Sequence, residues 1–321
     1  MTAITSPGDY GPLLRLLSHS ADVRRQLTQA SGQAATGRIA ETYAGLGAGA
    51  RVSLDLRPQL AHQQVWQGNI AGVSGRLEVT QDALKSIGQI ASDLYARTNT
   101  LNGLNPSDTQ NVAVLARQGL ERVAQLLNTK VGDVYVFAGQ DTATPPVPDT
   151  SPAVLTAALL ASDTATSPFS ATLGALPPTI EVGEGERVAV GLIANRNTLA
   201  VSPAPTTGSY IRDIMRGLAT LTTITSGPGL AATAADTRTR LSGALITLGM
   251  EAGGLGNVQA GLAARQVQSE ATVLALRTQV SGAEDVDLAA ALTRVSALQT
   301  QLQASYQILA GVRDLTLSRY L

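Results

Sequence analysis

The sequence contains no cysteine in its 321 residues, which excludes both a disulfide framework and a thiolate metal site. Aromatic residues make up only 3% of the chain, so a large aromatic core is not expected. The most apolar run, residues 153–161, is interrupted by Thr156 and is much shorter than the roughly 20 residues that a membrane-spanning helix needs. The sequence therefore predicts no membrane insertion.

An excess of positive charge is also absent. The chain has 23 Lys and Arg against 24 Asp and Glu, a formal net charge of -1, and the basic residues form no local run. Nucleic acid is therefore not an expected partner. Residues 1–9 contain neither a basic region nor an apolar stretch, so we expect no cleaved secretory signal peptide.

Motifs for catalysis or cofactor binding are equally scarce. Residues 45–50 match the G-x-G-x-x-A pattern, but they lack the preceding buried strand and the later acidic residue that dinucleotide binding requires. His19 and His62 lie in separate helical patterns without ligand partners at metal-site spacing. No G-x-S-x-G motif occurs. We therefore predict no catalytic residue, no cofactor and no metal, and the expected protein is not an enzyme.

Apolar residues at alternating three- and four-residue steps are abundant at both ends of the chain. This spacing is typical of a helix that packs lengthwise on another helix, so we expect the two termini to pair. Because small and polar residues fill the remaining positions, an isolated pair would be marginal, and neighbouring subunits are expected to order it. The predicted assembly interface consists of Leu13, Leu16, Val23, Leu27, Leu288, Val295, Leu298, Leu302, Leu309 and Val312.

Helical patterns also occupy much of the intervening chain. Residues 70–101 and 112–127 carry the same alternation and predict an antiparallel hairpin. Helical spacing returns at residue 211, is interrupted at 227–229, and continues to about 280. Two capping-box matches predict helix starts. They are Ser107 to Gln110 and Ser281 to Glu284.

The central residues have a different period. Alternation at every second residue on both sides of a glycine turn at 183–185 predicts a β-hairpin, within a mostly β insertion. The predicted fold is mainly α: long antiparallel helices in a coiled-coil bundle, with paired N- and C-terminal helices and a small β-rich central insertion. The expected domains are a terminal assembly domain (1–36 with 285–321), a helical bundle (37–142 with 207–284) and the insertion (143–206).

Three sequence blocks resemble the bacterial flagellin superfamily. Residues 33–38 end in Thr-Gly-Arg, similar to the step that closes the first helix in that family. Residues 133–139 look like its Gly-x-Tyr-Leu-Phe-x-Gly segment. The C-terminal block matches the family almost throughout. It comprises 284–287, Leu292-Thr293-Arg294, Gln299, Leu302, Ala304-Ser305-Tyr306 and 315–321.

Two groups within this superfamily fit differently. Flagellins carry an Asp-Asp-x-Ala-Gly type sequence soon after the first helix, from which residues 40–47 depart. Residues 183–196 and 211–218 resemble more closely the hook-filament junction proteins, the hook-associated protein 3 group.

The resemblance implies an extracellular structural subunit of the flagellum, exported without a cleaved signal peptide and polymerising at the junction between hook and filament. The implied partners are further copies of itself, hook protein or another hook-associated protein, flagellin, and an export chaperone. A flagellin, the filament subunit, is the alternative. A non-flagellar coiled-coil scaffold is the remote alternative from another functional class.

Overall fold

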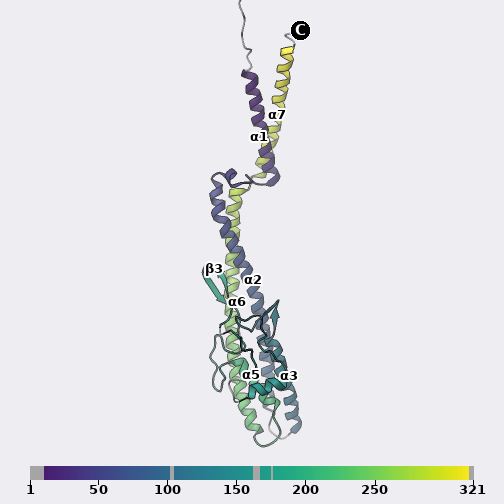
Figure 1. The fold of residues 1–321 in the computed structure, drawn as a ribbon, viewed down its shortest axis with the longest axis vertical. Helices are drawn as coiled ribbons and strands as arrows, with labels where there is room; N and C mark the ends of the chain where they lie inside the picture. Colours follow the sequence, from purple (N-terminus) through teal and green to yellow (C-terminus); the bar gives the residue numbers. More distant parts are fainter. Residues whose placement is uncertain (1–10, 102–104, 162–166, 175, 318–321) are drawn as a thin grey trace, which may run out of the picture. The chain divides into compact units, whose positions relative to one another are not determined.

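The computed structural model describes residues 11–101, 105–161, 167–174 and 176–317. These residues are mainly helical, with two small two-stranded antiparallel sheets, which confirms the predicted fold class (Figure 1). The contacts divide the chain into two compact units, residues 1–62 with 272–321, and residues 63–271. We call them the terminal unit and the bundle unit. The three expected domains, with their own boundaries, stay a prediction.

The terminal unit contains the two predicted terminal helices, α1 (Gly11–Thr36) and α7 (Leu288–Leu317), which pack against each other. Their chain directions are opposite, because Arg38 pairs with Asp285 at one end while Arg24 meets Tyr306 farther along. The predicted pairing is therefore confirmed, and we call α1 and α7 the terminal pair.

Two further helices, α2 (Gly49–Thr98) and α6 (Leu230–Glu284), contribute residues to both units. The sequence predicted the first of them only over 70–101, which was wrong at both ends. Between Gly49 and Ile70 the only buried residue is Ser53, so this part of the helix has no apolar stripe that periodicity could detect. A short 3₁₀ helix, η1 (Tyr43–Leu46), precedes α2.

The core of the bundle unit lies among α2, α6, α3 (Pro106–Leu127) and α5 (Tyr210–Thr222). The capping box predicted at Ser107 was wrong. Asn105 caps α3 instead, and its side chain accepts a hydrogen bond from the Ser107 amide, with Pro106 at the first helical position. Fully buried aliphatic side chains of α2 and α3 include Ile70, Leu77, Leu84, Ile87, Leu120 and Leu127.

The central residues combine strands with one helix. Strands β1 (Lys130–Val131) and β2 (Val134–Tyr135) form the first small sheet. Strands β3 (Thr179–Gly183) and β4 (Glu186–Ala189) form the second, which confirms the predicted hairpin. Gly185 has a φ of 70°, a conformation that glycine adopts without steric cost.

Helix α4 (Pro152–Leu160) is an addition to the predicted β-rich insertion, since no helix was predicted there. Its run of apolar residues is too uniform to show a helical period, so the sequence pattern missed it. Leu155 and Leu159 of this helix, with Val147 and Phe169, are buried in the same core as the bundle helices. The residues of the insertion therefore help to stabilise the bundle unit.

We expect Leu120→Ala to lower the free energy of unfolding of the bundle unit by about 2–5 kcal/mol, since Leu120 is completely buried. Val114→Ala in the same helix is the matched control, because Val114 is 49% exposed and should change stability by about 0.5 kcal/mol or less. Urea denaturation of both variants measures the difference. Equal losses would contradict the assigned core.

Candidate assembly surface on the terminal helix pair

The contact between α1 and α7 has a narrow apolar centre. Among the described side chains, Val23, Ala30 and Leu298 are buried there, and three partly buried residues pack against them. We call these six residues the terminal cluster. Its partly buried members are Leu27, Val295 and Leu302.

The other predicted interface residues have different positions. Leu16 and Leu309 are partly buried on the same helices. Leu288 is 49% exposed, so within one chain it does not pack into the contact between the two helices, and its role in assembly stays a prediction. The bridge between Arg38 and Asp285 places Leu288 level with the end of α1, where that helix no longer covers it. The side chains of Leu13 and Val312 lie outside the described residues.

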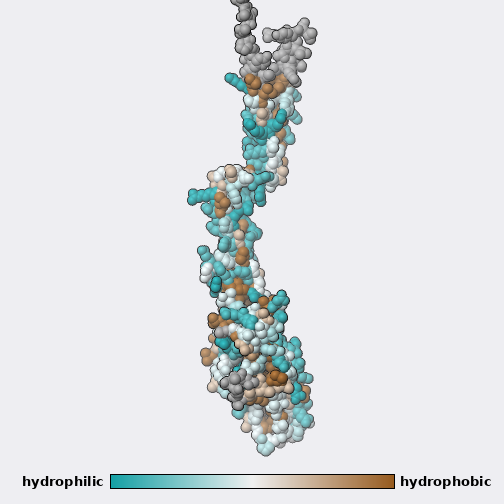
Figure 2. All heavy atoms as spheres, in the orientation of Figure 1, coloured by the Kyte–Doolittle hydropathy of each residue, from teal (hydrophilic) through white to brown (hydrophobic). Residues whose placement is uncertain are grey.

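Large apolar side chains are also exposed on the terminal pair. Leu14 and Leu17 of α1 are 63% and 44% exposed. On α7 the exposed residues are Leu288, Leu292, Tyr306 and Ile308. Figure 2 shows brown, apolar spheres on the outer surface of these helices. Because α7 carries apolar residues both toward α1 and away from it, one partner helix does not cover them all.

Sequence reasoning missed most of these exposed residues because it followed a single seam. Leu14 lies on the face of α1 opposite Val23, and Leu17 lies about 120° around the helix from Val23, given the roughly 100° step per residue of an α-helix. The sequence did contain a signal for these exposed residues, namely the apolar residues that fall outside the three- and four-residue steps of the seam. The terminal pair thus has a thin internal contact and several exposed large apolar side chains, a combination that suits further association.

Polar contacts between α1 and α7 add little to their association. The Arg24 guanidinium donates a hydrogen bond to the Tyr306 hydroxyl over 2.7 Å, and His19 lies 3.2 Å from the Gln301 amide. Both contacts are exposed to solvent, where such interactions contribute about 0–1 kcal/mol.

A short joint connects the terminal pair to the ends of α2 and α6. The Ile39 amide donates to the Glu284 carbonyl over 2.7 Å, and the Val286 amide donates to the Gly37 carbonyl over 2.9 Å. Gly37 has a φ of 71°, which allows the chain to turn after α1. Residues 285–287 contain neither glycine nor proline. The two hydrogen bonds between the segments at 37–39 and 284–286 therefore help to hold the break between α6 and α7.

The start of α7 corrects the second predicted capping box. Helix α6 continues through Ser281 to Glu284, so that tetrapeptide ends a helix instead of beginning one. Asp287 caps α7, and its carboxylate accepts hydrogen bonds from the amides of Ala289 and Ala290 over 2.9 and 3.1 Å. Asp287 and the nearby Asp285 also place negative charge at this helix start, where the helix dipole favours it.

The Glu284 side chain also stabilises the joint, through contacts with two residues of α2. Its carboxylate accepts a hydrogen bond from Arg57 Nε over 2.6 Å, and further bonds from Arg57 Nη2 and the Ser53 hydroxyl. Glu284 is 7% exposed and Ser53 is completely buried. The Arg57 hydrogen bonds, followed by the Ser53 bond, lower the pKa of Glu284 from 4.5 to about 2. The same pairing raises the pKa of Arg57.

The joint should therefore loosen in acid. A carboxyl group whose pKa is lower in the folded state contributes its full stabilisation above the unfolded value of 4.5, and that contribution is lost as the pH falls toward 2. We expect the NMR shifts of the Ile39 and Val286 amides to titrate in this window. Glu284→Gln should abolish that titration, whereas Glu270→Gln at an exposed position of α6 should preserve it. An unchanged titration in Glu284→Gln would contradict the assignment.

The described residues include no cluster of three or more His, Asp or Glu side chains able to hold a metal ion. None of the helices in this part of the chain is both long and apolar enough to cross a membrane.

Comparison with known proteins gives one family-model match and similar solved structures. Residues 240–321, from within α6 to the end of the sequence, match the family model for the bacterial flagellin C-terminal helical region. The structure of a flagellar hook-associated protein from Vibrio parahaemolyticus is similar, with a TM-score of 0.57 and 12% identity, over 73% of this chain and 96% of that one. At this identity the likeness shows a common fold. No curated protein matches the sequence.

A weaker structural likeness is to FlgL from Bacillus cereus. Its crystal structure has a TM-score of 0.43 and 16% identity, over 73% of this chain and 99% of that one.

Proposed function

We propose that this chain is a structural subunit of the bacterial flagellum and belongs to the flagellin superfamily. The observation that carries the proposal is the family-model match over residues 240–321, because it includes the whole of α7. The fold shared with a flagellar hook-associated protein supports it over most of the chain. As such a subunit it acts by assembly outside the cell and carries out no catalytic reaction.

Assembly proceeds through the terminal pair. The terminal cluster forms a thin contact within one chain, and neighbouring subunits cover the exposed apolar residues beside it. Residues 1–36 with 285–321 thus serve as the assembly domain. Residues 37–142 with 207–284 form the bundle, and 143–206 form its insertion.

Within the flagellum, we assign the chain to the junction between hook and filament. Residues 183–196 and 211–218 favour this position over the filament itself, by their resemblance to the junction proteins. The subunit is exported without a cleaved signal peptide, held beforehand by an export chaperone. Its partners after export are other copies of itself, hook protein or another hook-associated protein, and flagellin. The filament subunit is the second candidate, since the matched family model describes flagellin.

A deletion strain viewed by electron microscopy separates these two functions. Loss of a junction protein should leave bare hooks and release flagellin into the medium. Intact filaments that merely lack this chain would instead support a minor filament subunit. Normal flagella with no change in composition would contradict both assignments.

A further inference from the structure

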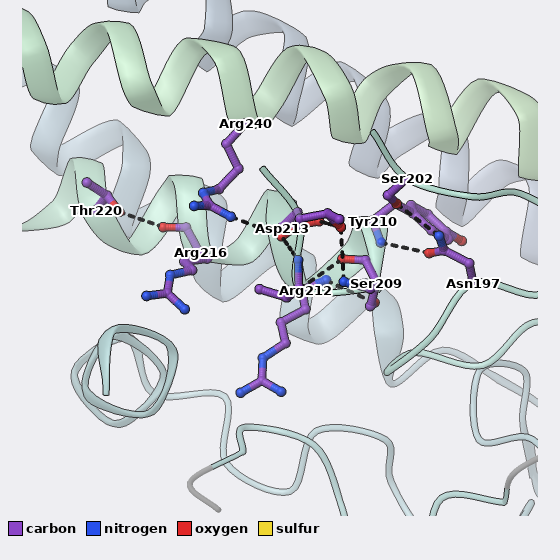
Figure 3. Close-up of polar contacts among 12 residues, drawn as sticks. Asn197, Ser202, Ser209, Tyr210, Arg212, Asp213, Arg216, Thr220 and Arg240 are labelled. Atoms are coloured by element: carbon purple, nitrogen blue, oxygen red, sulfur yellow. Dashed lines mark hydrogen bonds and ion pairs between the residues drawn. The ribbon is translucent and has the colours of Figure 1, made fainter. Parts of the chain in front are cut away.

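The segment that leads into α5 is attached to the bundle unit by buried polar groups. The Asn197 side chain accepts a hydrogen bond from the Tyr210 amide and donates one to the Ser202 hydroxyl, each over 2.9 Å (Figure 3). Residues 197–202 are thus held against the first turn of α5.

An acidic residue of α5, Asp213, also holds the segment that leads into this helix. The Asp213 carboxylate, which is 2% exposed, accepts hydrogen bonds from the Thr206 hydroxyl over 2.6 Å and the Thr207 amide over 2.9 Å. Arg240 of α6 lies 3.2 Å from it and supplies the opposite charge (Figure 3). Each oxygen of Asp213 therefore has a partner.

Glu251 of α6 holds the segment differently. It is completely buried, and its Oε1 atom accepts hydrogen bonds from three successive amides, those of Thr198, Leu199 and Ala200, over 2.7–2.9 Å. Its second oxygen, Oε2, is buried and has no partner within the protein. A buried carboxylate oxygen without a donor is costly, so the structure requires another explanation for this atom.

Two buried hydroxyl groups of residues in this attachment also lack partners within the protein. They are Thr198 Oγ1 and Tyr210 Oη. Thr198 is already bonded to Glu251 through its amide, and Tyr210 is bonded to Asn197, the residue before Thr198. Complete burial, and then the charge of Glu251, raise the pKa of Tyr210, so the phenol keeps its proton and can donate it.

We propose that one internal water molecule binds Glu251 Oε2, Thr198 Oγ1 and Tyr210 Oη together. A water molecule can donate one hydrogen bond to the carboxylate oxygen and accept one from each hydroxyl group. All three buried atoms are then satisfied by about the number of bonds that a buried water usually makes. A divalent cation fits less well, because it needs more oxygen ligands and the three amides already solvate the carboxylate.

This water links α5, α6 and the segment at 198–200 in one polar contact. It would complete the attachment of the central residues to the bundle, independently of the proposed flagellar function.

A high-resolution crystal structure of the full chain tests the site. We expect a density peak at hydrogen-bond distance from all three atoms, and its loss in the double variant Tyr210→Phe with Thr198→Val. A direct bond between Tyr210 Oη and Glu251 Oε2, an empty site, or a peak at the shorter distances of a bound cation would each overturn the proposal.

A thermodynamic cycle tests it in solution. Each single variant should lower the folding equilibrium constant of the bundle unit about tenfold. The decrease in the double variant should be smaller than the product of the two single decreases, since both hydroxyls bind one water. The control pairs Tyr210→Phe with Thr98→Val, whose hydroxyl bonds the Tyr95 carbonyl in its own helix. In that control pair, the fold-loss of the double variant should equal the product of the two single fold-losses. The same multiplicative result for Tyr210→Phe with Thr198→Val would overturn the shared water.

Discussion

Leu302→Asp is expected to abolish self-association at concentrations where the unaltered chain polymerises. Leu302 packs on the edge of the terminal cluster, whose buried members include Leu298. Burial of a leucine side chain contributes about 1.5–3 kcal/mol, and aspartate would in addition bring an unpaired charge into an apolar contact. Sedimentation velocity of the purified variant measures the loss directly.

Thr300→Asp is the matched control for this change. It adds the same charge to the same helix, but Thr300 is exposed and bonds only the Ser296 carbonyl, so association should persist. The thermal unfolding of the bundle unit should be unaltered in both variants, because neither residue belongs to that unit. A sharp loss of thermal stability in Leu302→Asp with assembly preserved would make the terminal helices part of a structural core.

Deletion of residues 285–321 should also abolish polymerisation. The truncated chain lacks α7, so Val23 and Ala30 of α1 lose the helix that buries them. We expect no seeded polymerisation, while the bundle unit keeps its helical circular dichroism and its unfolding midpoint, since α7 lies in the other unit.

The control for the truncation changes the central residues instead. Val201 is 89% exposed and lies outside the terminal pair, so Val201→Ser should polymerise normally. Normal assembly by the truncated chain, or failure confined to the Val201 variant, would move the assembly surface away from the terminal helices.

Much of the fold could be predicted from periodicity. Helix pairing at the termini was visible because Val23, Leu27, Leu298 and Leu302 repeat at three- and four-residue steps, and those residues do pack together. The β3–β4 hairpin was visible because its period of two flanks a glycine turn. In each case the signal is local in sequence.

The parts that were missed depend on contacts between distant residues or on uniform composition. The first part of α2 has no continuous apolar stripe, and α4 is apolar except for Thr156, so neither gives a clear helical period. The burial of Glu284 depends on Arg57 and Ser53, more than 200 positions earlier, and no local motif announces such a pairing. The same is true of Glu251 and the amides at 198–200.

Immunogold labelling of isolated flagella tests whether this chain is a flagellar structural subunit. In flagella detached from the cells, an antibody against this chain should place gold particles at the junction between hook and filament. Labelling along the whole filament would favour the filament subunit. Absence of the chain from isolated flagella, with the protein present elsewhere in the culture, would contradict its assignment as a flagellar structural subunit.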